Sequence, residues 1–173
     1  MSNRWGEADC GLVLSYGAGG VVTTFNTNGQ NYGLGTINTN LYDGADDALV
    51  GIINNSGGTM NSVHLTGSGN GGGIFAFDGD GQQGYPGGVS FTPPAPYTFT
   101  GYEGPNTAFT NIGPGGASGD VIFIGGLANG ATAWFSLEGS PGSIVTTNVP
   151  EPATLALLGM GLLAFSAARR RKK

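Results

Sequence analysis

Cysteine and histidine are almost absent from this sequence, and each absence removes a class of function. The one cysteine, Cys10, can form neither an intramolecular disulfide nor a thiolate cage for a metal. The one histidine, His64, alternates with Val63 and Leu65, so we expect it on the solvent face of a strand. Nucleophilic catalysis needs a base with a positioned nucleophile, and the sequence offers poor material for it. We therefore predict that the protein is not an enzyme.

Basic residues are missing from nearly the whole chain. Residues 1–149 contain ten acidic residues and a single basic one, Arg4. A body with this charge is repelled by phosphate backbones, which argues against nucleic acid as a partner. The other cations end the sequence as an uninterrupted run: Arg169, Arg170, Arg171, Lys172 and Lys173.

Helical periodicity and long apolar runs are also missing before residue 153. Short stretches rich in β-branched and aromatic residues, such as "NSVHLT", "DVIFIG" and "ATAWFSLE", alternate with turns of glycine, proline and asparagine. The chain has 35 glycines, but its nine phenylalanines and six tyrosines supply material for a core. This pattern predicts an all-β fold, an antiparallel β-sandwich or jelly-roll-like domain. One C-terminal transmembrane helix is expected to follow it.

Two stretches predict how individual strands are buried. Ala133, Phe135 and Leu137 alternate with residues on the opposite face, which favours burial on one side only. Residues 121–124, "VIFI", are apolar on both faces and predict a central strand.

The end of the chain has the layout of a membrane anchor. Residues 153–168 are sixteen residues of Ala, Leu, Gly, Met and Phe with one Thr and one Ser. As a helix this stretch is about 24 Å long at ~1.5 Å per residue, against a hydrocarbon core of ~30 Å. Bilayer thinning and snorkelling of the following arginines can close that gap, and the cations hold the C-terminus in the cytoplasm. A buried amphipathic helix with a solvated basic tip is the alternative.

The sequence "VPEP", the short apolar helix and the terminal Arg/Lys run together resemble a PEP-CTERM sorting signal. The resemblance covers residues 149–173 and places the recognition motif on Pro150, Glu151 and Pro152. In that family, Gram-negative bacteria that make exopolysaccharide export such proteins, and an exosortase in the inner membrane recognises the Pro-Glu-Pro motif. The resemblance therefore implies an exosortase and the inner membrane as partners, with exopolysaccharide as a further one. Localisation would begin in the inner membrane and end at the cell surface.

The body resembles the ectodomains found ahead of such tails. Stretches that carry this resemblance include "YDGADDALVGIINNSG", "GIFAFDGDG" and "YTFTGYEGPNTAFTNI". It implies an extracellular β domain without established activity. Family members begin with a signal peptide, whereas no basic start and apolar run of 7–15 residues is recognisable near residue 1.

These observations divide the chain into three segments. Residues 1–40 form an N-terminal segment whose strands either join the sandwich or precede it. Residues 41–147 are expected to form the β-sandwich ectodomain. Residues 148–173 form the sorting tail, with the motif at 150–152, the apolar helix at 153–168 and the basic cluster at 169–173.

Five aspartates on glycine-rich stretches are candidate Ca²⁺ ligands. "YDGADD" supplies Asp43, Asp46 and Asp47, and "FDGDG" supplies Asp78 and Asp80. Hard oxygen ligands on loops suit Ca²⁺, yet neither stretch completes an EF-hand, and Asp-Gly pairs are also ordinary hairpin turns. Both interpretations stay open, and no other cofactor is expected.

Two further patterns are weaker. Glu103 and Glu138 could form the carboxylate pair of a glycosidase, but solvated surface acids are the simpler interpretation. The expected function is a non-enzymatic exported surface or matrix protein, sorted by exosortase and associated with exopolysaccharide or biofilm. A carbohydrate- or surface-binding module, stabilised by Ca²⁺ or not, is the alternative.

Overall fold

The computed structural model describes residues 12–20, 22–25, 47–69, 72–84, 90–138 and 143–147, and strands dominate these residues. Loops and short 3-10 turns connect the strands there, and the described segments contain no α-helix. The prediction of an all-β fold is therefore confirmed, while the finer assignment to a sandwich or jelly-roll stays a prediction. The strands are β1 (Leu12–Gly17), β2 (Val22–Phe25), β3 (Ala48–Asn55), β4 (Met60–Gly69), β5 (Gly72–Gly73), β6 (Thr107–Thr110), β7 (Ser118–Leu127), β8 (Thr132–Leu137) and β9 (Ser143–Thr147).

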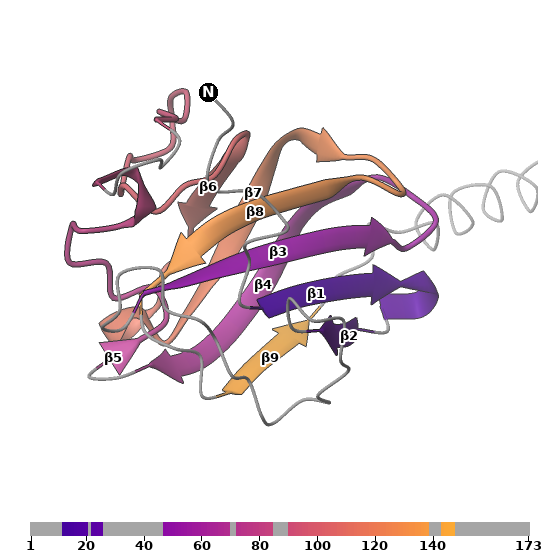
Figure 1. The fold of residues 1–173 in the computed structure, drawn as a ribbon, viewed down its shortest axis with the longest axis horizontal. Helices are drawn as coiled ribbons and strands as arrows, with labels where there is room; N and C mark the ends of the chain where they lie inside the picture. Colours follow the sequence, from indigo (N-terminus) through magenta and orange to yellow (C-terminus); the bar gives the residue numbers. More distant parts are fainter. Residues whose placement is uncertain are drawn as a thin grey trace, which may run out of the picture.

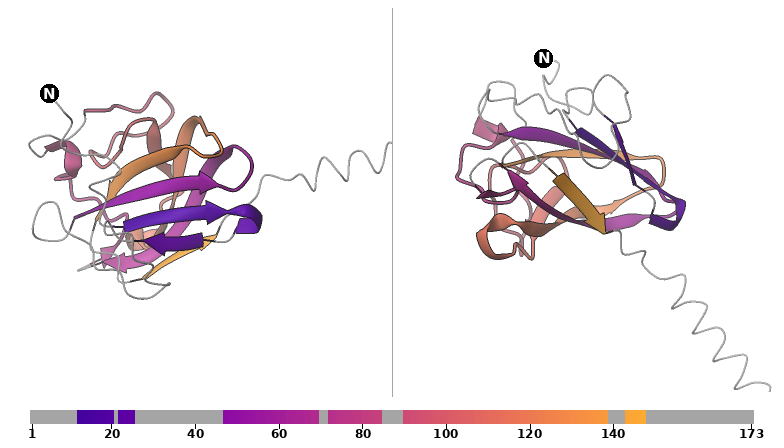
Figure 2. Two further views of the ribbon diagram at one scale, coloured as in Figure 1. Left: turned by 45° about the vertical axis from the view of Figure 1, so that its right-hand side comes forward. Right: turned by 90° about the horizontal axis from the view of Figure 1, so that it is seen from below.

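The strands form two sheets, shown in Figure 1 and from two further sides in Figure 2. The first sheet has the order β2-β1-β3-β8, and the second has the order β5-β4-β7-β6 with β9 paired to β4. All pairings are antiparallel except that of β1 with β3, which is parallel. Because β1 lies between β2 and β3, strands from before residue 41 take part in the first sheet.

One hydrophobic core receives side chains from both sheets. Alternation along the strands points them inward: Leu12, Leu14 and Tyr16 are buried on β1 while the residues between them are partly exposed. On β4, Val63 and Leu65 are buried as predicted. The core of the described residues comprises Leu12, Leu14, Tyr16, Val50, Ile52, Met60, Val63, Leu65, Ile74, Phe75, Tyr102, Phe109, Val121, Phe123, Leu127, Ala133, Phe135 and Leu137.

Strand β7 is central, between β4 and β6, as its apolar sequence predicted. Strand β8 differs from expectation, because the residues from Ala133 to Leu137 are buried on both faces. The cause is the segment around Tyr102, whose carbonyl oxygen accepts hydrogen bonds from the backbone N–H and the hydroxyl of Ser136 at 2.9 and 3.2 Å. One-face burial was therefore wrong for β8.

An aromatic cluster beneath β8 fixes the position of Tyr102. The Phe77 ring stacks on the Tyr102 ring with centroids 4.4 Å apart, and Phe109 lies 4.9 Å from Phe77 and 5.8 Å from Phe135. Such pairs contribute about 0.5–1.5 kcal/mol each beyond the burial of their area. The cluster thus holds a tyrosine whose side chain comes from a loop, not from a strand.

Glu103 fastens the same loop from within. Its carboxylate accepts hydrogen bonds from the backbone N–H groups of Thr100 and Gly101 and from the Thr100 hydroxyl, at 2.8 to 3.0 Å. Its carbonyl oxygen accepts from the side chains of Gln82 and Gln83. Glu103 is wholly buried, so its interpretation as a solvated acid was wrong.

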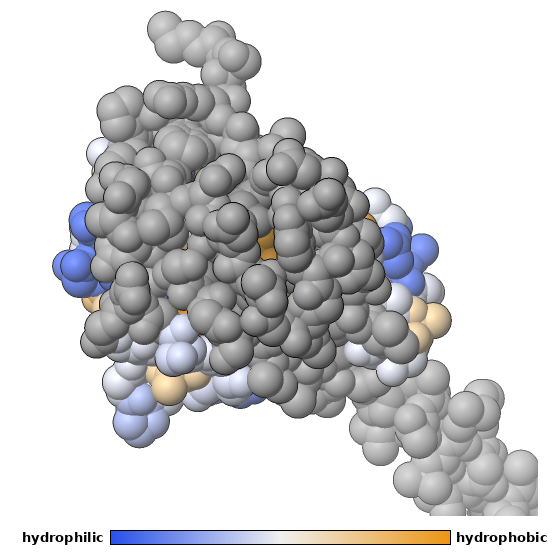
Figure 3. Space-filling view, turned by 60° about the horizontal axis from the view of Figure 1, so that its bottom comes forward, coloured by the Kyte–Doolittle hydropathy of each residue, from blue (hydrophilic) through white to orange (hydrophobic). Residues whose placement is uncertain are grey.

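The described residues visible in Figure 3 are mostly blue to white, with tan or orange, hydrophobic colour in small spots. None of the described segments forms a helix with the length and apolarity needed to cross a bilayer. The predicted helix at 153–168 and the rest of the sorting tail lie outside the described residues.

Gly104 allows this loop to approach β8 closely, because a Cβ at that position would collide with the carbonyl oxygen of Trp134. We expect Gly104→Ala to lower the free energy of unfolding by about 1–3 kcal/mol, as overpacked sites do. Gly58→Ala is the matched control, because an added Cβ there meets no atom within 4 Å. It should change stability by less than about 0.5 kcal/mol in urea unfolding. Equal effects of both substitutions would contradict the close packing of the loop.

Candidate functional site

Three carboxylates from separate parts of the chain meet at one end of the first sheet. Asp47 directly precedes β3, Glu138 directly follows β8, and Asp80 lies in the loop after β5. The pairing of Ala48 with Leu137 places Asp47 and Glu138 side by side. One carboxylate oxygen from each of the three acids lies within 4.8 Å of those of the other two. We call this set the acidic cluster.

The Tyr102 hydroxyl lies inside the acidic cluster. It is 2.6 Å from Glu138 Oε2, 2.8 Å from Asp80 Oδ1 and 3.3 Å from Asp78 Oδ1. Since a phenol has one hydrogen, it can donate to only one of these oxygens at a time. When the hydroxyl donates to Glu138, its short contact with Asp80 brings two oxygens together without that hydrogen. A proton on the Asp80 carboxyl group or a nearby cation would stabilise this contact.

Asp78 and Asp80 are brought to the cluster by a tight turn. The Asp80 backbone N–H donates to Asp78 Oδ1 at 3.3 Å, a local bond typical of aspartate in turns. Gly79 between them has a φ of 106°, which side chains other than glycine rarely adopt. "DGDG" therefore forms a bend within the loop after β5, not a hairpin turn, and this bend carries Asp80 into the cluster.

A hydrogen bond between Asp78 and Asp80 and the burial of Tyr102 shape the protonation of this site. The side-chain hydrogen bond with Asp78 raises the pKa of Asp80, although the Tyr102 hydroxyl acts in the opposite direction. The same bond lowers the pKa of Asp78. Burial, followed by the hydrogen bond to Glu138, raises the pKa of Tyr102 well above its usual range, so its hydroxyl remains a donor.

The geometry of the acidic cluster fits a hard cation. Oxygens that bind one Ca²⁺ at 2.3–2.6 Å lie at most about 5.2 Å from one another, and the cluster oxygens satisfy that limit. Ca²⁺ takes six to eight oxygen ligands, so backbone groups or water would have to supplement three carboxylates. Glu138 is 8% exposed and Asp47 is fully buried, whereas Asp80 is exposed to solvent.

Sequence analysis identified some of the possible ligands in and around the acidic cluster. It named Asp47 and Asp80, which the structure brings together, and Asp78, which reaches the same tyrosine. Asp43 and Asp46 lie outside the described residues. Glu138 and Tyr102 were missed as possible ligands. Glu138 had been interpreted as a solvated acid, which its burial contradicts.

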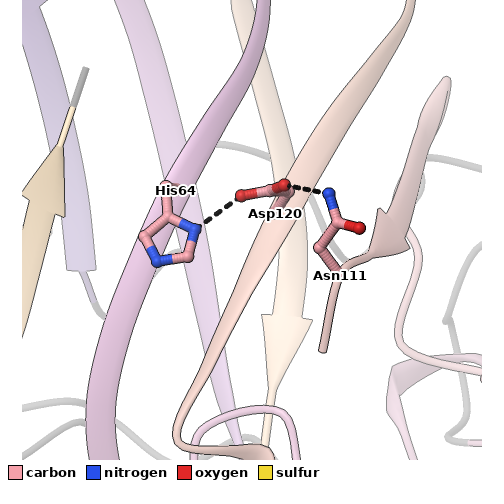
Figure 4. A network of polar contacts seen from close by, with 3 residues as sticks. All are labelled: His64, Asn111 and Asp120. Atoms are coloured by element: carbon pink, nitrogen blue, oxygen red, sulfur yellow. Dashed lines mark hydrogen bonds and ion pairs between the residues drawn. The ribbon is translucent and has the colours of Figure 1, made fainter. Parts of the chain in front are cut away.

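A second polar network lies on the second sheet, drawn in Figure 4. His64 Nδ1 on β4 is 2.6 Å from Asp120 Oδ1 on β7, and Asn111 donates to the other Asp120 oxygen at 2.7 Å. The His64 side chain is 36% exposed, in keeping with a solvent-facing strand position. This contact joins the neighbouring strands β4 and β7.

The comparisons with known proteins concern the tail. Residues 148–172 match the model of the PEP-CTERM protein-sorting motif. The chain carries a PEP-CTERM sorting motif. No curated protein and no solved structure matches the chain.

The PEP-CTERM match confirms the recognition made from the sequence. It contains Pro150, Glu151 and Pro152 together with the apolar run and most of the basic cluster. The motif implies processing by an exosortase and export toward the cell envelope or surface. The match covers only the tail and does not extend to the β domain, which contains the acidic cluster.

The raised pKa of Asp80 predicts a pH dependence of stability without metal. A carboxyl with a raised pKa stabilises the folded protein below the unfolded pKa, and this contribution is lost as pH rises through the folded pKa. Asp78, whose pKa is lowered, titrates below that window. We therefore expect the wild-type melting temperature in chelator to fall as pH rises above 3.8.

Asp80→Asn should remove this component, because an amide does not titrate. Thermal unfolding between about pH 4 and pH 7 measures the difference between variant and wild type. Parallel curves over the whole range would contradict the shared proton at Asp80.

Proposed function

We propose that the protein is a non-enzymatic surface or matrix protein that an exosortase sorts through its tail. The PEP-CTERM match at residues 148–172 is the observation that carries this proposal. The order of motif, apolar run and cations supports it, because each part has a separate physical role. The association with exopolysaccharide or biofilm rests on the resemblance of the tail to signals from bacteria that make these polymers.

The proposed sorting begins with a single helix in the inner membrane. Residues 153–168 prefer lipid to water because they carry no charge, and the five cations after them resist translocation. Pro150 and Pro152 cannot lie within the helix and would mark its start. The acidic body would then lie on the far side of the membrane, with the motif near the interface.

The polar side chains of the β domain support a role without catalysis. The buried Glu103 carboxylate holds a loop, and Asp120 is shared by His64 and Asn111. Each of these groups has a structural task that accounts for its position. A binding or scaffolding surface requires no further chemistry.

Alanine in place of Pro150, Glu151 and Pro152 should leave the tail unprocessed. Behind a secretory signal peptide, in a host that has an exosortase, the wild-type chain should lose its tail and reach the surface. The triple variant should remain full-length in the membrane fraction, because the apolar run still inserts. Asn148→Ala is the neighbouring control and should be processed normally. Recovery of wild-type protein only from the cytosol would contradict the proposal.

A second proposal is that the β domain is a carbohydrate- or surface-binding module stabilised by Ca²⁺. The acidic cluster favours it, since Asp47, Asp80 and Glu138 converge within 4.8 Å. A separate fact supports an external cation: residues 12–147 contain no lysine or arginine. Within the described residues, no such side chain can therefore neutralise the cluster. The cation would tie β3, β8 and the loop after β5 together.

Ca²⁺ should raise the melting temperature of the wild-type protein. A ligand that binds only the folded state adds about 2.7 kcal/mol at 100 times its Kd. Asp80→Asn and Glu138→Gln should remove most of this gain, because each replaces a carboxylate ligand by an amide. Asp120→Asn removes a carboxylate from the other sheet and should keep the gain. A wild-type melting temperature that is unchanged at millimolar Ca²⁺ would remove the metal from the proposal.

A further inference from the structure

The last strand of the domain ends immediately before the sorting motif. Strand β9 ends at Thr147, which pairs with His64 on β4. The PEP-CTERM match begins at residue 148, and Pro150 follows Thr147 by three residues. The motif is thus tied to a folded sheet with almost no linker.

This short connection limits where the motif can go while β9 stays in place. Three residues span at most about 11 Å when fully extended. A domain of about 135 residues has a radius of gyration of about 14 Å, so the body is wider than the tether. An enzyme in the membrane that binds the motif would have to accommodate the whole body against its surface. That body also offers no lysine or arginine between residues 12 and 147 to hold it against anionic lipid.

Strand β9 has few pairings, so it can detach from the sheet while the rest of the domain stays folded. Among the described residues it pairs with one strand only, β4, over the five residues from Ser143 to Thr147. Figure 1 shows it at the rim of the molecule. Strand β4 is paired with β7 on its other side from Met60 to Thr66, so the sheet stays closed there when β9 is absent. Edge elements with a single neighbour open at lower free energy than the core of a domain.

We propose that β9 detaches from β4 when the exosortase takes the tail, so that the segment presented to the enzyme begins at Ser143. The inference rests on the proposed sorting function. Detachment adds five residues to the tether, or about 17 Å in extended form. The motif then reaches its enzyme while the core and the first sheet remain folded.

A disulfide that locks β9 to β4 tests this directly. Thr66 pairs with Val145 on β9 and with Ser118 on β7, so one position offers both a lock and its matched control. Directly opposed residues of antiparallel strands are close enough for a disulfide. In a Cys10→Ser background, Thr66→Cys with Val145→Cys ties β9 down. Thr66→Cys with Ser118→Cys ties only β4 to β7.

The measurement is the fraction of full-length chain that loses its tail in a host with an exosortase, with the disulfide verified in each variant. The β9-locked variant should be processed at least tenfold more slowly, and reductant should restore it, whereas the β4–β7 variant should behave like its parent. Processing of the oxidised β9-locked variant at the parental rate would overturn the inference alone. A Cys10→Ser parent that is never processed would overturn the sorting function and this inference together.

A longer tether shows whether the lock prevents processing by limiting the reach of the motif or by disturbing the fold. Ten Gly/Ser residues between Thr147 and Asn148 lengthen the tether by about 17 Å on average, without freeing β9. In the oxidised β9-locked variant this insertion should restore processing to within about threefold of the parent. Continued failure would show that the lock acts by another route and would overturn the argument from tether length.

Discussion

Between residues 12 and 147 the chain has eight acidic residues and no lysine or arginine, and this constraint governs how the domain can bury charge. A buried carboxylate needs a partner, because desolvation without one is costly. Glu103 meets the requirement with backbone N–H groups of its own loop. In the acidic cluster the Tyr102 hydroxyl lies near both Glu138 and Asp80, and its single hydrogen cannot serve the two carboxylates at once. A proton shared by Asp78 and Asp80, which their opposite pKa shifts reflect, or an external cation would add to this compensation.

The same constraint separates the domain from its tail. All lysines and arginines but Arg4 follow the apolar run, so the positive charge of the chain lies at its C-terminal end. A body rich in lysine or arginine would weaken that asymmetry and would adhere to anionic membranes. The absence of lysine and arginine from the β domain therefore has one consequence for the tail and one for the acidic cluster. It leaves the orientation signal to the tail, and it makes the acidic cluster a place where a small cation meets no competitor among the described side chains.

Elements that depend on local pattern were predictable from the sequence, and elements that depend on pairing were not. Alternation at Leu65 indicated a strand and its inward face, and the apolar run around Phe123 indicated a central strand, because both signals are local. The parallel pairing of β1 with β3 carries no local signal, since it joins segments more than thirty residues apart. Glu138 illustrates the limit most clearly. Its neighbours in the sequence predicted exposure, but the Tyr102 loop, held by Phe77 and Glu103, covers that end of β8.

The acidic cluster and strand β9 belong to different sheets. The acidic cluster is built on the pairing of β3 with β8 and on the loop that carries Tyr102. Strand β9 belongs to the second sheet and contacts β4, whose partner β7 remains in place. Four residues separate Glu138 from Ser143, so the chain can leave the second sheet at β9 without pulling directly on the cluster. If β9 detaches as proposed, the strand pairing that holds the acidic cluster is kept. The reverse arrangement, with the tail leaving from β8, would couple every processing event to the loss of the acidic cluster.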